Sequence, residues 1–234
     1  MAIYFSATAR RLGIFSAVGV VVLGVAYATT LIVGFLSLRS PEEPIRDPMF
    51  SILEILIIVM MPVMVALMVV VHAWAPPHVK TFSLTAVVFM GLVAGVTCSV
   101  HFVILTLSRQ AAFAGQPVLP LLLSFKWPSV VYVLDILAWD FFFPLSMLFA
   151  APVFCGSRLT VSIRMLMIAS GVLAFAGLGG VVTGSMQLRN IGIVGYLGMF
   201  LVVVWLLAVL FSRTRPVAAD RGSPMGDERL KAGE

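Results

Sequence analysis

The sequence contains few charged residues for its length. Aspartate, glutamate, lysine and arginine make up 11% of its 234 residues, whereas 61% are hydrophobic and the mean hydropathy is +1.12. About one quarter of a typical soluble domain is charged. The composition therefore excludes a soluble domain and predicts an integral membrane protein, for which the bilayer is the main solvent.

Cysteine is nearly absent, with only Cys98 and Cys155 in the chain. The two fall towards opposite ends of their apolar segments, so we expect no disulfide between them. No CxxC pair and no Cys/His spacing of the kind that binds zinc is present. We therefore predict neither a metal nor a cofactor.

Motifs that would identify a chemistry are missing as well. Lys80 and Lys126 lie at segment ends, whereas a retinal Schiff base needs a lysine within a helix. A bis-histidine haem needs two histidines at one depth, but His72 and His101 fall near opposite membrane surfaces. No serine lies in a nucleophile-elbow motif, and no internal repeat is visible. In a membrane protein, basic residues that give a net charge of +5 set the orientation of the spans and contact anionic lipid, and they do not indicate nucleic-acid binding.

Long hydrophobic runs are what the chain does contain. About 20 apolar residues suffice to cross a bilayer as a helix, and runs of this length are too long for barrel strands. We predict an all-α, polytopic six-helix bundle over residues 1–212, followed by a disordered cytoplasmic tail over 213–234. The six predicted spans are 12–38, 48–74, 81–108, 128–152, 161–185 and 190–212.

The distribution of positive charge predicts the orientation. With the N-terminus inside, the outer side holds only Arg39, Arg46, Arg109, Lys126 and Arg189. The inner side holds Arg10, Arg11, Lys80, Arg158, Arg164, Arg213, Arg215, Arg221, Arg229 and Lys231. This asymmetry predicts a bacterial-type inner membrane protein with both termini cytoplasmic. The first run continues to Leu38, which favours an uncleaved helix over a signal peptide.

Several local patterns predict how the spans begin, bend and pack. Asp47 before Pro48 is typical of a helix start, and Pro62 should kink the second span. The apolar, proline-broken connection 109–126 indicates an interfacial or re-entrant segment over the outer mouth of the bundle, or a loop resting on lipid headgroups. Gly91 and Gly95, like the glycines of the fifth span, predict close helix packing.

Three ionisable side chains are predicted to share one depth. Spans two and four run opposite to span three, and an α-helix rises about 1.5 Å per residue. Glu54 then lies roughly 9 Å, and Asp135 and His101 roughly 10 Å, below the outer ends of their spans. Intramembrane acids face a bundle interior or a cavity. We therefore predict Asp135, Glu54 and His101 as catalytic residues.

Helical spacing adds a predicted binding pocket around these three residues. Its lining combines residues that share one helical face of spans two, three and four with polar residues from the turn between spans five and six. These residues are Tyr132, Trp139, Phe142, Met61, Cys98, Arg189 and Asn190. Asp140 lies five residues after Asp135 and so points about 140° away in an α-helix. This angle favours a structural role for Asp140 in helix packing.

Each of these residues also has a purely structural interpretation. In that interpretation Glu54 pairs with Arg189 or Arg46, and His101 packs between helices with its hydrogen bonds made. Arg189 and Asn190 then only anchor a turn at the headgroups. A metal site built from Glu54, His101 and Asp135 is conceivable chemically, but no chelating i,i+3 or i,i+4 pair supports it.

Three functions fit this set of features. The first is an intramembrane enzyme of isomerase or cyclase type that acts on, or binds, a lipophilic small molecule such as an isoprenoid. A low dielectric favours the neutral acid, which makes a carboxyl group a proton donor near neutral pH. The second is a small proton-coupled transporter or channel, and the third a non-catalytic accessory subunit. The expected partners are membrane lipids and a hydrophobic ligand. The sequence leaves open whether the protein forms a homo-oligomer.

Overall fold

The computed structural model describes residues 5–40, 43, 45–108, 110 and 118–215. These residues form an all-α bundle in which six helical segments are long and apolar enough to cross a membrane. The prediction of a polytopic six-helix bundle is confirmed, and the six spans agree with the predicted ranges to within a few residues. The predicted tail from residue 216 onward, and residues 109 and 111–117 of the predicted interfacial segment 109–126, lie outside the described residues.

The spans include both single helices and chains of short ones. The elements in order are α1 (Ala7–Leu36), α2 (Met49–Trp74), η1 (Pro77–Val79), α3 (Lys80–Leu107), α4 (Leu119–Leu123), α5 (Val130–Ile136), η3 (Leu137–Phe142), α6 (Phe143–Ala150), η4 (Ala151–Val153), α7 (Arg158–Thr183), α8 (Met186–Ile193), η5 (Val194–Met199) and α9 (Phe200–Arg213). Of these, η3 and η5 are π-helices. The fourth span comprises α5, η3, α6 and η4, and the sixth comprises α8, η5 and α9.

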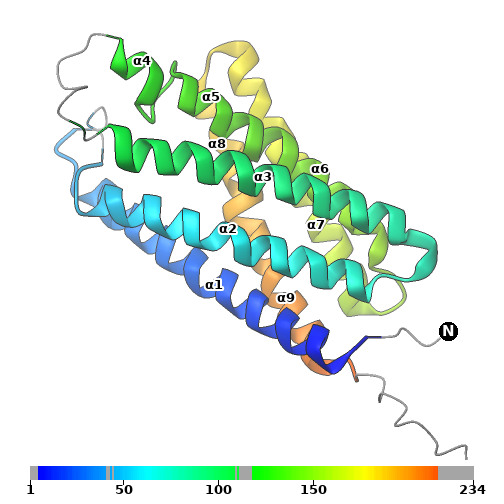
Figure 1. Cartoon of the computed structure of the whole chain (residues 1–234). Helices are drawn as coiled ribbons and strands as arrows, with labels where there is room; N and C mark the ends of the chain where they lie inside the picture. The colour runs from blue at the N-terminus through cyan, green and yellow to red at the C-terminus, as the bar shows by residue number, and fades with distance from the viewer. Residues whose placement is uncertain (1–4, 41–42, 44, 109, 111–117, 216–234) are drawn as a thin grey trace, which may run out of the picture.

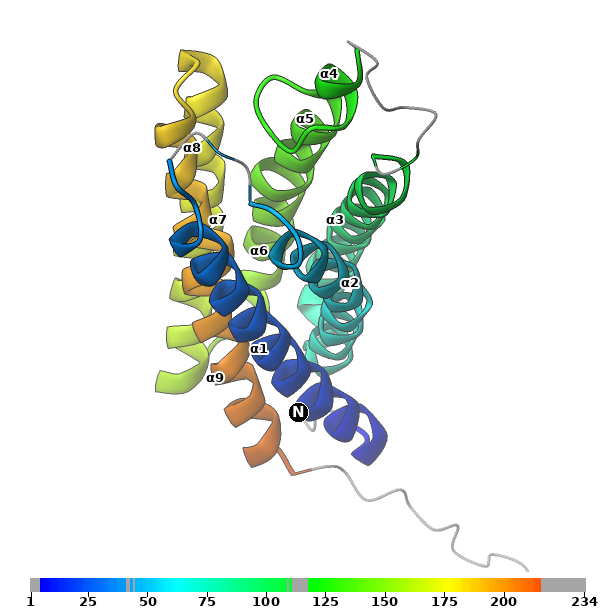
Figure 2. The ribbon, with the colours of Figure 1, turned by 90° about the vertical axis from the view of Figure 1, so that its left-hand side faces the viewer.

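Consecutive spans pack side by side and close into a ring. α1 packs on α2, α2 on α3, α3 on α6, α6 on α7, and α7 on α8, while α9 returns to α1. Figures 1 and 2 show the start of α1 and the end of α9 at the same end of the bundle, with α4 at the opposite end. We refer to these as the terminal end and the α4 end.

Local sequence signals fix where several helices begin and end. The hydroxyl groups of Ser6 and Ser129 accept hydrogen bonds from the backbone N–H groups of Ala9 and Tyr132, which caps α1 and α5. A serine at this position satisfies a backbone donor that the helix leaves unpaired. Gly184 ends α7 with φ of +71°, a left-handed conformation that favours glycine.

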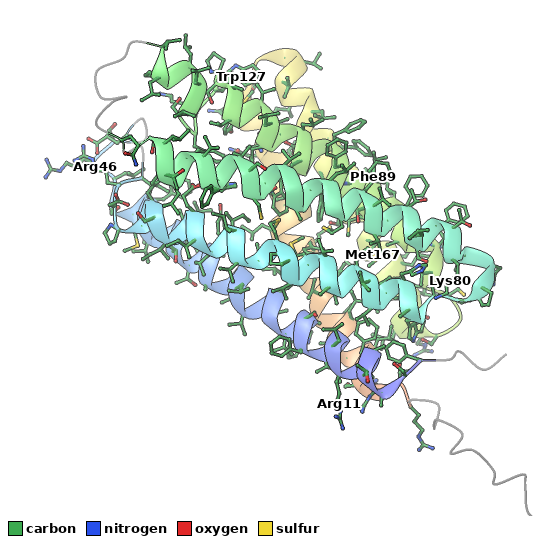
Figure 3. All side chains as sticks on the ribbon, viewed as in Figure 1. Arg11, Arg46, Lys80, Phe89, Trp127 and Met167 are labelled. Carbon is green, nitrogen blue, oxygen red and sulfur yellow. The ribbon has the colours of Figure 1, made fainter. Side chains whose placement is uncertain are left out.

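The terminal end of the bundle has an apolar core rich in methionine. The buried side chains there and in the middle of the bundle include Met61, Met64, Met68, Met90, Met147 and Met167, together with Phe143, Phe154 and Phe211. Polar groups at this end are held locally. The Lys80 ammonium group donates to the carbonyl groups of His72 and Ala73, and His72 Nδ1 lies 2.8 Å from Ser83 Oγ. Figure 3 shows Lys80 and Arg11 at this end, and Trp127 and Arg46 at the other.

The glycines fall into two groups with opposite surroundings. A Cβ atom on Gly195 would lie 2.6 Å from the Ser170 carbonyl oxygen, and one on Gly180 would lie 2.5 Å from the Arg189 backbone nitrogen. Both glycines permit close helix contact, which the sequence predicted for Gly180 in the fifth span. At Gly91 and Gly95, however, a Cβ atom would meet nothing within 4 Å. The prediction of close packing at these two positions is wrong, because this face of α3 is open.

This contrast predicts opposite effects of one substitution. We expect Gly195→Ala to lower the unfolding free energy by about 1–3 kcal/mol, because the new methyl group overlaps backbone atoms of α7. Gly95→Ala is the matched control and should leave stability unchanged or slightly raised, since alanine favours a helix. Thermal unfolding of the two variants in one detergent measures the difference. Equal midpoints would contradict the close contact between η5 and α7.

Candidate functional site

A histidine between two carboxylates forms the first half of the site. His101 Nδ1 on α3 lies 2.7 Å from Glu54 Oε2 on α2, and His101 Nε2 lies 3.6 Å from Asp135 Oδ1 on α5. All three side chains are buried. The structure therefore brings together the three residues that the depth argument placed at one level. Their catalytic roles stay predictions.

Arg189 extends this arrangement through the bundle. Its Nη2 lies 3.2 Å from Asp135 Oδ2, its Nε donates to Asp140 Oδ2 at 3.0 Å, and its Nη1 donates to the Tyr132 hydroxyl group at 3.0 Å. The guanidinium carbon also lies 4.9 Å from the Tyr132 ring centroid, a cation–π distance. We call the series Glu54, His101, Asp135, Arg189 and Asp140 the polar chain.

The π-helix η3 explains why Asp140 belongs to the polar chain. An α-helix would turn Asp140 away from Asp135, which is what the sequence predicted. In the structure both carboxylates contact the same guanidinium group. A π-helix closes its turns with i→i+5 hydrogen bonds, so residues five apart approach one face. The predicted orientation of Asp140 is therefore wrong.

The predicted partners of Glu54 and the predicted position of Arg189 also need correction. Glu54 pairs with His101, whereas Arg46 lies 3.7 Å from Glu43 at the surface. Arg189 does not snorkel at a turn but is buried within the sixth span. The reason is that α8 begins at Met186, four residues before the predicted start. Gly180 then allows the Arg189 backbone to approach α7 closely.

Three aromatic residues near the polar chain were missed by the sequence reasoning. Tyr27 on α1 lies near Asp135, Glu54 and Arg189, and Tyr196 on η5 lies near Arg189 and Asp140. The Phe125 ring centroid lies 5.4 Å from that of His101 and 5.2 Å from that of Tyr132. A usable signal existed for the tyrosines, because the chain has only four and three of them adjoin the polar chain.

The other predicted lining residues turn to different neighbours. Trp139 packs on Tyr196 and Phe143, with centroid distances of 5.2 and 5.7 Å, and Phe142 packs on Phe89 at 6.3 Å. Met61 is part of the apolar core, and Cys98 Sγ lies 3.8 Å from the Ile58 carbonyl oxygen. Asn190 is exposed. These residues contact different neighbours, and a common cavity lined by them stays a prediction.

A groove lies beside the polar chain, between α3, α4 and α5. It has a volume of about 510 Å³. It is lined by Gly95, Val96, Ser99, Val100 and Val103 of α3, Leu122 and Leu123 of α4, and Val130, Val131 and Leu134 of α5. A second hollow of about 400 Å³ shares Val130 and Leu134 and continues to Pro128. We call the two together the α3–α5 groove. Its lining is almost entirely apolar and includes none of the ionisable residues of the polar chain.

Two buried oxygen atoms near the polar chain have no hydrogen-bond partner among the described residues. They are Asp140 Oδ1 and Thr97 Oγ1, and both side chains are 0% exposed. Thr97 lies one helical turn from His101 on the same face of α3. Gly177 and Gly192 leave room for the Asp140 carboxylate, because a Cβ atom on either would lie 2.7 or 2.5 Å from its Oδ1. Buried polar atoms in proteins usually have partners, so these two mark capacity for a proton, a water or a ligand.

The chain matches no protein-family model, no curated protein and no solved structure. Its function therefore has to be inferred from the chemistry of the site. Within the described ranges, no group of three or more His, Cys, Asp and Glu residues is placed to hold a metal ion. Both ring nitrogens of His101 instead face carboxylates, a geometry in which a proton can be given to one side and taken from the other.

The ion pairs of Arg189 generate a prediction about stability. Arg189→Met should lower the unfolding free energy by about 3–5 kcal/mol, because Asp135 and Asp140 lose their shared cation inside the bundle. The double variant Arg189→Met/Asp140→Asn should lose less than the sum of the single variants. Unfolding midpoints of the three variants measure this coupling.

Arg46→Ala is the control for that cycle. It removes an exposed ion pair, and such pairs contribute about 0–1 kcal/mol. Additive effects of the Arg189 and Asp140 substitutions would show that the two side chains do not interact as the coordinates place them.

Proposed function

We propose that this membrane protein binds a lipophilic small molecule in the α3–α5 groove and exchanges protons with it through Glu54, His101 and Asp135. The observation that carries this proposal is the contact of both His101 nitrogens with carboxylates, one residue away from the groove wall. Val100 and Val131 line the groove and directly adjoin His101 and Tyr132 in the chain. An apolar hollow with a few polar groups close by is the usual form of a small-molecule site.

The chemistry that suits these groups is isomerisation or cyclisation of an alkene. A protonated carboxyl group of Asp135 or Glu54 adds its proton to one carbon of a C=C bond, and the bond electrons form the new C–H bond. The neighbouring carbon becomes a cation, which aromatic faces stabilise. His101 or the second carboxylate then removes a proton from an adjacent carbon, whose C–H electrons form the new double bond. Protons and electrons balance without an added oxidant or reductant.

A second candidate function is proton-coupled transport, because the polar chain joins four of the six spans. Against it stands the apolar core between Glu54 and His72, which lie about 27 Å apart along α2 at 1.5 Å per residue. The groups at the terminal end are already satisfied locally by Ser83 and by helix carbonyl groups. The third candidate is a non-catalytic subunit, in which the polar chain serves only to hold the helices together.

Deuterium incorporation tests the leading proposal without knowledge of the substrate. The protein is incubated in D₂O with a total lipid extract, and the lipids are then analysed by mass spectrometry. We expect one lipid species to gain deuterium at carbon, because a base removes a proton and an acid returns solvent deuterium. Asp135→Asn should abolish this gain while the unfolding midpoint stays near that of the wild type.

Glu54→Gln and His101→Gln divide the donor and acceptor roles in the same assay. Glu43→Gln is the matched control, since it neutralises a carboxylate at the surface. Deuterium gain in Asp135→Asn at the wild-type rate would refute a role for Asp135 in proton exchange. Proton flux into liposomes without any labelled lipid would support the transporter instead.

We further propose that both termini are cytoplasmic, as the distribution of basic residues suggests. A fluorescent protein that folds only in the cytoplasm should be bright when fused after Arg213. Alkaline phosphatase at the same position should be inactive. A fusion inserted after Gln110, at the α4 end, should give the reverse pattern. An active phosphatase after Arg213 would reverse the proposed orientation.

A further inference from the structure

We infer that the ligand of the α3–α5 groove carries a positive charge at the end that reaches Asp135, as a lipophilic amine or quaternary ammonium compound does. This inference rests on the proposed function and narrows its ligand class. It follows from the charge of the polar chain, from unpartnered polar atoms beside it, and from the aromatic rings at its weakest link.

The polar chain has more negative than positive groups. Glu54, Asp135 and Asp140 are three carboxylates, whereas Arg189 and a protonated His101 are only two cations. The fully ionised chain therefore has a formal net charge of −1. An uncompensated charge is costly inside a membrane, so the site favours one further positive charge, which can be a proton or a cationic ligand.

The unpartnered atoms favour a ligand that donates N–H groups, such as a protonated amine, whereas a quaternary ammonium group can balance the charge but cannot donate a hydrogen bond to them. Thr97 Oγ1 is buried without a partner one turn from His101, and Asp140 Oδ1 is buried without a partner beside Arg189. Leaving such atoms unsatisfied costs free energy. The site therefore has acceptor capacity that the described protein groups do not fill.

The weakest link of the polar chain locates the added charge. The distance between His101 Nε2 and Asp135 Oδ1 is 3.6 Å, whereas the other links of the chain range from 2.7 to 3.2 Å. The rings of Phe125 and Tyr132 lie beside this gap. Aromatic faces attract cations, so a ligand ammonium group that displaces the His101 ring from Asp135 meets a carboxylate and two rings.

Access to this position is lateral, from the groove. The hydrophobic body of the ligand occupies the groove beside Gly95, where a Cβ atom would meet nothing within 4 Å. Phe125 is 37% exposed and covers His101. In this inference, rotation of the Phe125 side chain opens a path from the groove to Asp135.

A permanently charged ligand should displace the proton that otherwise balances the site. The groups facing that proton are the polar chain itself and the hydroxyl groups of Tyr27, Tyr132 and Tyr196. Binding of a quaternary ammonium compound should therefore release protons and tighten as the pH rises. A neutral ligand of equal length should do neither.

The experiment compares two probes of one chain length, dodecyltrimethylammonium and dodecanol, on the full chain in phosphatidylcholine nanodiscs. Bound ligand is counted by native mass spectrometry, and proton release is followed with a pH indicator in weak buffer. Empty nanodiscs correct for partition into lipid. We expect the ammonium probe to bind at least about tenfold more tightly, the scale of a desolvated cation–π contact and ion pair.

Two variants separate the charge from the groove. Asp135→Asn should remove the preference for the ammonium probe and its proton release, while dodecanol binding persists. Gly95→Leu fills the groove and should weaken both probes. Unfolding midpoints of both variants verify that they fold.

The outcomes decide between the inference and the proposed function. Equal binding of the two probes, or an ammonium preference unchanged in Asp135→Asn, overturns the cationic ligand and leaves the groove intact. Binding of both probes that is unaffected by Gly95→Leu overturns the groove as the site. Deuterium incorporation tests the proton chemistry separately, so the failure of one proposal is distinguishable from the failure of the other.

Discussion

The buried guanidinium group of Arg189, shared by Asp135 and Asp140, is the contact on which the rest of the structure depends. Each of these ions alone would be costly in a membrane interior. Together with Glu54 and His101 they alternate in sign, so every charge has an opposite neighbour. The alternation fixes which faces of α2, α3, α5, η3 and α8 turn inwards, because any rotation of one helix would strand a charge.

The backbone is adapted to bring these charged groups close together. The π-helix η3 turns Asp140 to the side of Asp135, and π-helical segments are often found at functional sites. Gly180 permits close approach of the Arg189 backbone to α7, while Gly177 and Gly192 leave space for the Asp140 carboxylate. Side chains at these glycines would press against the polar chain itself. Packing in this part of the bundle thus serves an electrostatic arrangement, whereas packing at the terminal end is simply apolar.

The sequence predicts the spans well because hydropathy over some 20 residues depends little on tertiary contacts. It also predicts the common level of Glu54, His101 and Asp135, since that needs only the helix rise and alternating direction. It does not predict the direction of Asp140, because a periodicity argument assumes an α-helix throughout. The sequence predicts Arg189 at a turn because the predicted sixth span starts at residue 190. The helix starts four residues earlier, about one helical turn, which places Arg189 inside the span. The sequence also does not predict the contacts of the expected lining residues, because helical faces alone do not reveal which neighbour each face meets.

The position of the polar chain within the bundle favours a ligand that arrives from the lipid. The methionine-rich core separates the polar chain from the terminal end, so a path for ions across the whole protein would have to cross apolar side chains. Towards the lipid, by contrast, the α3–α5 groove approaches to within one residue of His101 along α3 and one of Tyr132 along α5. The proposed site, with excess negative charge and an apolar groove nearby, would select molecules that combine a hydrophobic body with a cationic or protonatable end. The same arrangement would stabilise a carbocation formed by proton transfer, which makes the binding preference and the proposed chemistry two consequences of one charge imbalance.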